Sequence, residues 1–476
     1  MKKIYQSEQI KIIDELAAKH LNINSFELMQ KAGSAIFSYV RQYQNILVVA
    51  GAGNNAGDGF IIAQLALKQG LNVTVWSLIP IENLPPDAYH AATLYLQSGG
   101  QIITQPPQAR FDCIVDALFG TGLCRDIKGR FAEAVHWINS QNTFVIAVDI
   151  PSGLDADTGK IMACVINADI TVTVICYKAG LFTNNGKDQC GTLFCEDLDI
   201  PSLAFSQVPS QINLLDKSVL KHSGLNHRHN SHKGSFGQVL IAGGHDGMLG
   251  ALMLAGRSAL RTGCGIVEVV SNCEQAVMIS IQCPELITAS NIKASRFVKT
   301  ADVIAVGPGL GLNQQSREVL EYCLAQNKPM VIDADAITLI VEKYKFNNNI
   351  VLTPHPKEAA SLLKTDVAEI QSNRVEAAIK ISQKYNACVV LKGSGTVVAD
   401  TNGDVFICPF GYSGMATAGM GDVLTGMVAS LMAQGCIPID AANIAVVWHA
   451  IAADNCKKGN GLIASDVIQQ LANEVL

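Results

Sequence analysis

The chain has no excess of basic residues. Its 476 residues include 35 Lys and Arg against 41 Asp and Glu, which gives a formal net charge of −6. Such a chain lacks the positive field that holds a nucleic-acid backbone, so we expect no nucleic-acid partner. It also lacks an apolar run of the ~20 residues that a membrane-spanning helix needs, and no apolar leader follows Met1-Lys2-Lys3. We therefore expect no membrane partner and a cytoplasmic location.

Closely spaced cysteine pairs are also absent. Fourteen cysteines occur, but none forms a C-x-x-C pair. Most lie within apolar segments that we predict to be strands or helices, as Cys113, Cys176, Cys264 and Cys388 do. Buried, reduced thiols in a cytoplasmic protein explain this pattern better than disulfides or a zinc site.

Apolar residues make up 49% of the sequence and charged residues only 16%. That composition favours a folded α/β protein with large cores over disorder. A chain of 476 residues exceeds one typical domain, and two domains of ordinary size are expected. We place the boundary near residue 212, which gives domains of 1–212 and 213–476, and we find no internal repeat.

Short β-branched runs alternate with helical periodicity in both halves, and this predicts α/β folds. For the first half we expect a Rossmann-like doubly wound sheet, with strands at 45–50, 72–77, 111–117, 143–149, 168–176 and 192–195 and helices at 7–20, 24–43, 60–69 and 88–97. For the second half we expect strands from 237 and at 265–270, 303–306, 330–333, 349–352, 388–392, 396–399 and 405–408, with helices at 250–262, 316–326, 357–363, 370–385, 423–434 and 441–457.

Residues 206–234 interrupt this alternation with a polar, irregular stretch. His227, His229 and His232 suggest a metal site, but no cysteine or acid lies among residues 222–233 to complete one. We interpret the stretch as a solvated linker.

Three motifs of the first half each follow a predicted strand. Gly51–Gly59 is a glycine-rich turn that opens a helix, where backbone N–H groups hold phosphate and asparagine oxygens ligate cations. Asp116 and Asp149 each end a later strand. Ligands of open parallel sheets bind outside the carboxyl ends of the strands, so we expect the three motifs to converge. Simple capping and turn roles are the alternative interpretation of each motif taken singly.

In the second half, the glycine-rich segment Gly411–Gly426 surrounds one acid, Asp422, where an apolar helical pattern begins. Backbone N–H groups and a helix N-terminus at such a junction attract an anion. A carboxylate in the same place repels phosphate, so we interpret Asp422 as a base aimed at a nucleophile beside a phosphoryl group. An ordinary N-cap is the alternative.

The motifs of residues 1–210 resemble, in order and spacing, the NAD(P)H-hydrate epimerase domain. They read G-x-G-N-N-x-G-D-G, V-D-A-L-F-G-T-G and V-D-I-P-S-G-L-D. The resemblance implies an acid/base at Asp149 and a potassium ion held by Asn55, Asp116 and Ser152. It implies substrate contacts from Asn54, Asn55, Ala56, Gly57 and Asp58, from Gly120, Thr121, Gly122, Leu123, Cys124, Arg125 and Asp126, and from Asp149. Ala56 departs from the glycine usual in that family.

Residues 213–476 resemble the ADP/ATP-dependent NAD(P)H-hydrate dehydratase, a ribokinase-like domain. The resemblance is carried by K-G-S-F-G at 233–237, G-M-L-G-A at 247–251, V-G-P-G-L-G at 306–311, L-T-P-H-P-K-E at 352–358, K-G-S-G-T at 392–396 and G-M-G-D at 419–422. It implies nucleotide contacts from Lys392, Gly393, Ser394, Gly395, Thr396 and Gly421, with magnesium accompanying ADP or ATP. It places the hydrated substrate near Ala251, Gly309, His355 and the base Asp422. Lys357 and Met420 depart from the residues common in the family.

Together these resemblances imply repair of hydrated NADH and NADPH (NADHX and NADPHX). The first domain would epimerise the R and S hydrates through loss of the C6 hydroxyl and return of water. The second would phosphorylate that hydroxyl of the S hydrate from ADP or ATP, with Asp422 drawing its proton, and then expel phosphate. We also expect a homo-oligomer.

Two other classes of function stay open. A ribokinase-like small-molecule kinase fused to a nucleotide-binding domain would share the glycine-rich turn and the base, although the presence of Asn55, Asp116 and Asp149 argues against it. A non-catalytic nucleotide sensor or scaffold is disfavoured because Asp149 and Asp422 are both present.

Overall fold

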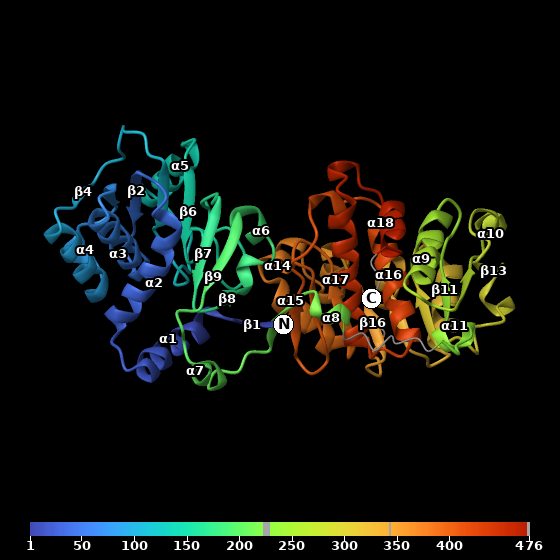
Figure 1. Ribbon diagram of the computed structural model, residues 1–476. Coiled ribbons are helices and arrows are strands. Elements are labelled where there is room, and N and C mark those ends of the chain that lie inside the picture. The colour runs from blue at the N-terminus through green and yellow to red at the C-terminus, as the bar shows by residue number, and fades with distance from the viewer. Residues whose placement is uncertain (222–228, 342–343, 474–476) are drawn as a thin grey trace. The chain divides into compact units, whose positions relative to one another are not determined.

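The computed structural model describes residues 1–221, 229–341 and 344–473. The chain divides into an N-terminal unit, Lys3–Ile212, and a C-terminal unit, Asn213–Leu476, which also takes in Met1–Lys2 (Figure 1). Each unit combines helices with a largely parallel sheet, so the predicted α/β class is confirmed. Among the described residues, no helix has both the length and the apolar character needed to cross a membrane.

The N-terminal unit is built on seven parallel strands in the order β4-β3-β2-β5-β6-β7-β9. Register pairs Val49 of β2 with Asp116 of β5, and Asp116 with Ala147 of β6. The carboxyl ends of these three strands are therefore neighbours, as the convergence of the motifs requires. The strands are β2 (Asn45–Ala50), β3 (Asn72–Ser77), β4 (Gln101–Ile103), β5 (Cys113–Ala117), β6 (Phe144–Val148), β7 (Ile170–Val174) and β9 (Thr192–Glu196), with β1 (Lys2–Tyr5) and β8 (Tyr177–Lys178) paired separately.

Both faces of this sheet are covered. Ile46 and Val48 of β2 belong to the core beneath α2 (Ser25–Val40), α3 (Asn54–Lys68) and α4 (Pro86–Gln97). Leu47 and Val49 point the other way, because side chains alternate along a strand, and pack with α5 (Arg130–Ser140). This is the doubly wound arrangement predicted, although α5 itself was not. The remaining helices are α1 (Ser7–Leu21), α6 (Gly186–Gln189) and α7 (Ser202–Ser206).

In the described part of the C-terminal unit, nine strands of the sheet lie in the order β13-β12-β11-β14-β15-β16-β17-β18-β19, and β10 (Ile212–Leu214) lies next to β19. Neighbours from β13 to β17 pair in parallel, and β18 and β19 add antiparallel strands at one end. Their bounds are β11 (Gln238–Ala242), β12 (Ile266–Val270), β13 (Ile287–Ala289), β14 (Val303–Val306), β15 (Met330–Ile332), β16 (Ile350–Leu352), β17 (Cys388–Leu391), β18 (Val397–Ala399) and β19 (Val405–Ile407). Of these, β13 was not predicted.

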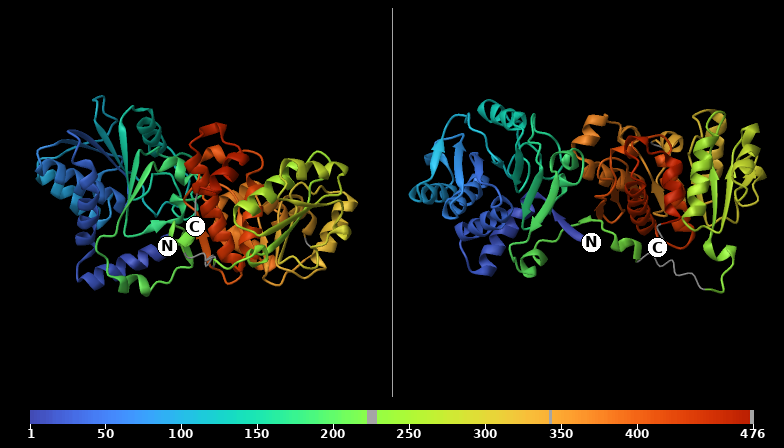
Figure 2. Two further views of the ribbon diagram at one scale, coloured as in Figure 1. Left: turned by 45° about the vertical axis from the view of Figure 1, so that its right-hand side comes forward. Right: turned by 45° about the horizontal axis from the view of Figure 1, so that its top comes forward.

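Val239 and Ile241 of β11 join the core formed with α9 (Leu249–Arg261), α16 (Met420–Ala433), α17 (Pro438–Cys456) and α18 (Ala464–Leu471). Leu240 and Ala242, on the opposite face, are fully buried as well. The orange-to-red segment with α16, α17 and α18 lies together in both views of Figure 2. The other helices are α10 (Val277–Gln282), α11 (Gln314–Leu324), α12 (Ala334–Ile340), α13 (Pro356–Leu363), α14 (Val367–Ser372) and α15 (Arg374–Tyr385).

The structure corrects two helix predictions. The helix predicted over 370–385 is two helices, α14 and α15, because Asn373 is extended and its side chain accepts a bond from Glu376 N at 3.0 Å as an N-cap. The helix predicted from residue 60 begins at Asn54, so the glycine-rich motif supplies its first turn.

The predicted linker carries short elements, β10 (Ile212–Leu214) and α8 (Ser218–Lys221). His229 and His232 are exposed, in agreement with a solvated stretch, and His227 lies outside the described residues. All fourteen cysteines are free thiols, as predicted.

Candidate active sites

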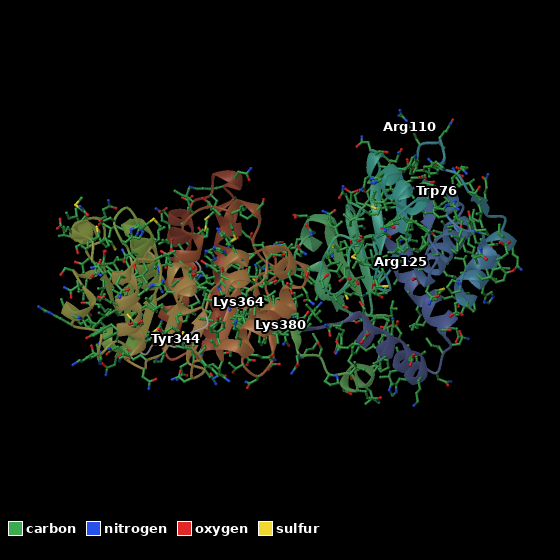
Figure 3. The ribbon with its side chains drawn as sticks, turned by 180° about the vertical axis from the view of Figure 1, so that it is seen from behind. Trp76, Arg110, Arg125, Tyr344, Lys364 and Lys380 are labelled. Atoms are coloured by element: carbon green, nitrogen blue, oxygen red, sulfur yellow. The ribbon has the colours of Figure 1, made fainter. Side chains whose placement is uncertain are left out.

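The N-terminal unit contains a cavity of about 810 Å³. That volume is within the range of small-molecule and cofactor sites. The cavity is lined by residues from the ends of β2, β5 and β6, and by α1 and α2. Of the residues predicted to contact substrate, Asn54, Asn55, Asp58, Gly120, Thr121, Gly122, Leu123, Cys124, Arg125 and Asp149 line it. Figure 3 labels Arg125, which is exposed.

Three predicted contacts lie outside the cavity wall. Ala56 is fully buried and belongs to the core between α3 and the sheet. A Cβ added at Gly57 would lie 2.4 Å from Met29 Sδ, so this glycine serves close helix packing. Asp126 is exposed and does not line the cavity. The departure of Ala56 from the family glycine therefore leaves the cavity wall unchanged.

Two of the motif loops pack directly against each other. A Cβ added at Gly51 would lie 1.8 Å from the carbonyl oxygen of Leu118, so only glycine fits there. A Cβ added at Gly120 would lie 3.4 Å from Asn55 Oδ1. This contact brings the amide of Asn55 beside the turn that follows β5.

The predicted potassium ligands gather at this contact. Asp116 is fully buried, and its Oδ1 accepts the Ser152 hydroxyl at 2.6 Å while its Oδ2 accepts Ser152 N at 2.8 Å. Burial raises the pKa of Asp116 to about 6, against the opposing effect of these hydrogen bonds. The Nδ2 atom of Asn55 is buried and finds no hydrogen-bond partner in the described part of the chain.

Asp149 occupies a strained position just after β6, with φ of 68°. Its Oδ1 accepts three hydrogen bonds, from Thr173 Oγ1 at 3.0 Å, Val174 N at 3.1 Å and Lys178 Nζ at 2.5 Å. The side chain of Lys178 is only 1% exposed. Burial opposes its charge, but the ion pair with Asp149 raises the pKa of Lys178 above its usual value.

Sequence reasoning missed Lys178, although a signal was present. It is the one charged residue in the apolar stretch 170–182, and a lysine in such a stretch needs a buried partner. Asp14 of α1 also lines the cavity and was not predicted.

In the C-terminal unit, Asp422 lies in the first turn of α16. The turn begins at Gly419, whose left-handed φ of 89° suits glycine and places it against Leu254 of α9. Burial and the nearby Asp333 raise the pKa of Asp422 to about 7, while Lys392 opposes the shift. Met420 is only 7% exposed, and its apolar side chain packs in the core.

Asp333 organises the surroundings of Asp422. It follows β15 and is 1% exposed. Its Oδ1 accepts Lys392 Nζ and Thr353 Oγ1, each at 2.7 Å, and its Oδ2 accepts Thr425 Oγ1 at 2.7 Å. Burial alone would raise the pKa of Asp333, but these partners, led by Lys392, hold it below its usual value. A Cβ added at Gly421 would lie 3.3 Å from Lys392 Nζ. The predicted nucleotide residues Lys392 and Gly421 therefore meet beside Asp422.

The rest of the predicted nucleotide motif, Gly393 to Thr396, joins β17 to β18. Arg374 of α15 supports the start of this segment, because its Nη2 donates to the carbonyl oxygens of Leu391 at 3.1 Å and Lys392 at 3.2 Å. A Cβ added at Gly393 would lie 2.7 Å from this guanidinium, and Arg374 is only 1% exposed.

His355 caps α13, with Nδ1 accepting Lys357 N at 3.1 Å and Glu358 N at 3.2 Å. Burial and Lys392 lower the pKa of His355, which favours the neutral ring. The backbone N–H of His355 donates to Glu358 Oε2 at 2.7 Å, and that oxygen lies 3.9 Å from Lys392 Nζ. His355 is thus connected to the group around Asp333.

Ala251 and Gly309, which were predicted to lie near the hydrated substrate, are close to each other. A Cβ added at Gly309 would lie 3.5 Å from the Cβ of Ala251, and the φ of Gly309 is 56°. Helix α9, which carries Ala251, packs along α16, which carries Asp422.

The two halves of the chain match two known families. Residues 25–180 match the family described as YjeF-related protein N-terminus, and residues 239–474 match the family described as NAD(P)H-hydrate dehydratase. The chain is 38% identical to the bifunctional NAD(P)H-hydrate repair enzyme Nnr of Escherichia coli, over 98% of this chain and 93% of that protein. It is 35% identical to the enzyme of that name in Coxiella burnetii, over 99% of each. The chain belongs to the bifunctional NAD(P)H-hydrate repair enzyme family.

Two solved structures confirm the ribokinase-like fold predicted for the second half of this repair-enzyme family member. One is the ADP/ATP-dependent NAD(P)H-hydrate dehydratase of Bacillus subtilis, crystallised with ATP and Mg²⁺, with a TM-score of 0.51 and 28% identity over 55% of this chain and 96% of that one. The other is a ribokinase-like superfamily protein of Enterococcus faecalis, with a TM-score of 0.52 and 27% identity over 55% and 95%.

Proposed function

We propose that the N-terminal unit interconverts the R and S hydrates of NADH and NADPH, and that the C-terminal unit dehydrates the S hydrate with ADP or ATP. The observation that carries this proposal is the presence, in one member of the repair-enzyme family, of two separately built acid sites. Asp149 faces a cavity of about 810 Å³, and Asp422 stands beside Lys392 at a glycine-rich helix start.

In the epimerase reaction the C6 hydroxyl leaves with help from the lone pair of the ring nitrogen. The resulting iminium is then attacked by water from either face. The ion pair and the two other donors all meet Oδ1 of Asp149, so within the described residues Oδ2 is available to the substrate. We assign to Asp149 the acceptance of the proton that the entering water loses.

A potassium ion fits the group formed by Asp116, Ser152 and Asn55. Carboxylate, hydroxyl and amide oxygens are the ligands that hard cations prefer. Within the described residues the buried Nδ2 of Asn55 has no hydrogen-bond partner, and a half-turn of that amide would present its oxygen instead. Bound there, the ion would supply positive charge to orient the substrate's diphosphate.

In the dehydratase reaction the C6 hydroxyl of the substrate must be activated, because hydroxide is a poor leaving group. Asp422 takes the proton of the C6 hydroxyl as its oxygen attacks the terminal phosphoryl group. The N–H groups at 419–421 and the ammonium of Lys392 stabilise the negative charge that develops there. Magnesium would accompany the nucleotide and neutralise part of the phosphate charge. Phosphate then leaves, C5 loses a proton, and the reduced nicotinamide is restored.

The first experiment is absorbance at 340 nm on a fresh mixture of R and S NADH hydrates with Mg²⁺ and ADP or ATP. We expect full recovery of NADH, and in Asp149→Asn a fast phase that stops at the S fraction. That result would demonstrate both activities in one chain. A stable phosphorylated product, or no recovery with either nucleotide, would contradict the proposal and favour a small-molecule kinase.

Replacing Arg374 by Met tests the support of the nucleotide loop. One buried and one partly buried carbonyl group would lose this donor, at a cost of about 1–3 kcal/mol, so the loop should loosen. We expect the KM for ADP to rise by roughly tenfold with a smaller change in kcat, because Arg374 does not itself reach the site. Steady-state dehydration of S hydrate measures both. An unchanged KM, or equal loss of epimerase activity, would contradict this role.

A further inference from the structure

Asp14 is a carboxyl group in the cavity wall for which neither the motifs nor the family match accounts. It lies on α1, before residues 25–180 that match the family of the N-terminal half. Its Oδ1 is shielded from solvent and has no hydrogen-bond partner in the described part of the chain. Asp14 as a whole is half-buried, but a charged oxygen that is shielded from water and has no partner is unfavourable, so this position favours a neutral carboxylic acid.

Charged groups from several elements face Asp14. Lys178 of β8 attracts its carboxylate, whereas Asp149 after β6 and Glu15 on the same helix repel it. Asp58 of α3 and Cys176 are also close enough that a charge on Asp14 raises their pKa values. Burial is the largest influence, and together these groups raise the pKa of Asp14 to about 7.

Of the carboxyl groups that line this cavity, Asp14 and Asp149 thus differ sharply in environment. Oδ1 of Asp149 accepts the ion pair from Lys178 and two further hydrogen bonds. Asp14 shares the cavity with it, but within the described residues its Oδ1 accepts no hydrogen bond. When two carboxyl groups at one site are held in different protonation states, one serves as acid and the other as base or anion.

We propose that Asp14 is the general acid of the epimerase site, and that it protonates the C6 hydroxyl as that group leaves. This inference depends on the proposed function and adds the proton donor, which the proposed function leaves unassigned.

The proton count of the cycle balances. The Asp14 carboxyl proton moves to the hydroxyl oxygen as the C6–O bond breaks, water departs, and the ring-nitrogen lone pair becomes the second bond of the iminium. Water then attacks C6, that electron pair returns to nitrogen, and the proton lost by the water passes to Oδ2 of Asp149. Exchange through solvent then removes this proton from Asp149 and returns one to Asp14, which restores the starting state.

The test is epimerisation of purified R hydrate by the full chain without nucleotide, with R and S separated by chromatography between pH 6 and 9. An acid must be protonated to act, so the wild-type rate should be flat below about pH 7 and fall at higher pH. General acid catalysis is worth roughly 10²–10⁴-fold, so Asp14→Asn should lose at least about 100-fold at pH 6. The Asp14→Asn variant should also lose the decrease in rate at high pH, and Asp14→Glu should restore that decrease.

Two controls separate this role from a structural one. Dehydration of pure S hydrate with ADP by the same Asp14→Asn protein should equal wild type. Glu8→Gln, the same acid-to-amide change at an exposed position of α1 away from the cavity, should not alter epimerisation.

An Asp14→Asn enzyme with the wild-type rate, or with a uniform loss that keeps the fall at high pH, would overturn the role of Asp14 alone. A wild-type protein that fails to epimerise R hydrate at every pH would overturn the proposed epimerase itself, and this inference with it.

Discussion

Replacing Asp422 by Asn should abolish ADP-dependent recovery of NADH from S hydrate and leave epimerisation intact. The carboxylate is the only base assigned to the C6 hydroxyl, and its loss should slow dehydration by roughly 10²–10⁴-fold. Because the pKa of Asp422 is raised to about 7 and a base must be deprotonated, wild-type dehydration should increase with pH up to about 7 and then level off. The variant should lack that increase.

The measurement is absorbance at 340 nm on pure S hydrate, with chromatography of R and S from the same preparation as the check on the other unit. Glu376→Gln is the matched control, because it makes the same acid-to-amide change at an exposed ion pair of the C-terminal unit. Dehydration that survives in Asp422→Asn, or a pH profile identical to wild type, would remove Asp422 from the chemistry.

Much of the fold follows from local patterns in the sequence. The strands at 111–117 and 143–149 were predicted because they alternate with helical patterns along the chain, and such an alternation is visible in the local sequence. Parallel pairing then brings their carboxyl ends together without further information. The helix α16, which follows the turn at Gly419, was predicted from the local apolar pattern that begins beside Asp422.

The residues that tune the two acids were harder to predict because their partners are distant in sequence. Lys178 lies 29 residues from Asp149, and Lys392 lies 59 residues from Asp333. Only the folded sheet brings such pairs into contact. Asp333 did carry a local signal, since it ends a strand and precedes a helix as Asp116 and Asp149 end theirs, but nothing local indicated its partner.

Replacing Lys392 by Met should both lower the free energy of unfolding of the C-terminal unit and stop dehydration. The change leaves Asp333 buried without its cation, and breaking a buried ion pair costs about 3–5 kcal/mol. For a unit of this size that corresponds to a fall of roughly 10 °C in the calorimetric midpoint. The transition of this unit can be assigned in wild type as the one that ADP raises. Lys380→Met, at an exposed lysine of α15 (Figure 3), is the matched control and should leave the midpoint unchanged.

The double variant Asp333→Asn/Lys392→Met separates the two roles of Lys392. Removing both charges eliminates the unpaired buried carboxylate, so most of the lost stability should return. Dehydration should not return, because the ammonium beside Gly421, to which we assign stabilisation of the transferring phosphoryl group, is still missing. Recovery of both would mean that Lys392 acts only as the partner of Asp333. Recovery of neither would mean that the Asp333 carboxylate itself, through Thr353 and Thr425, holds the site together.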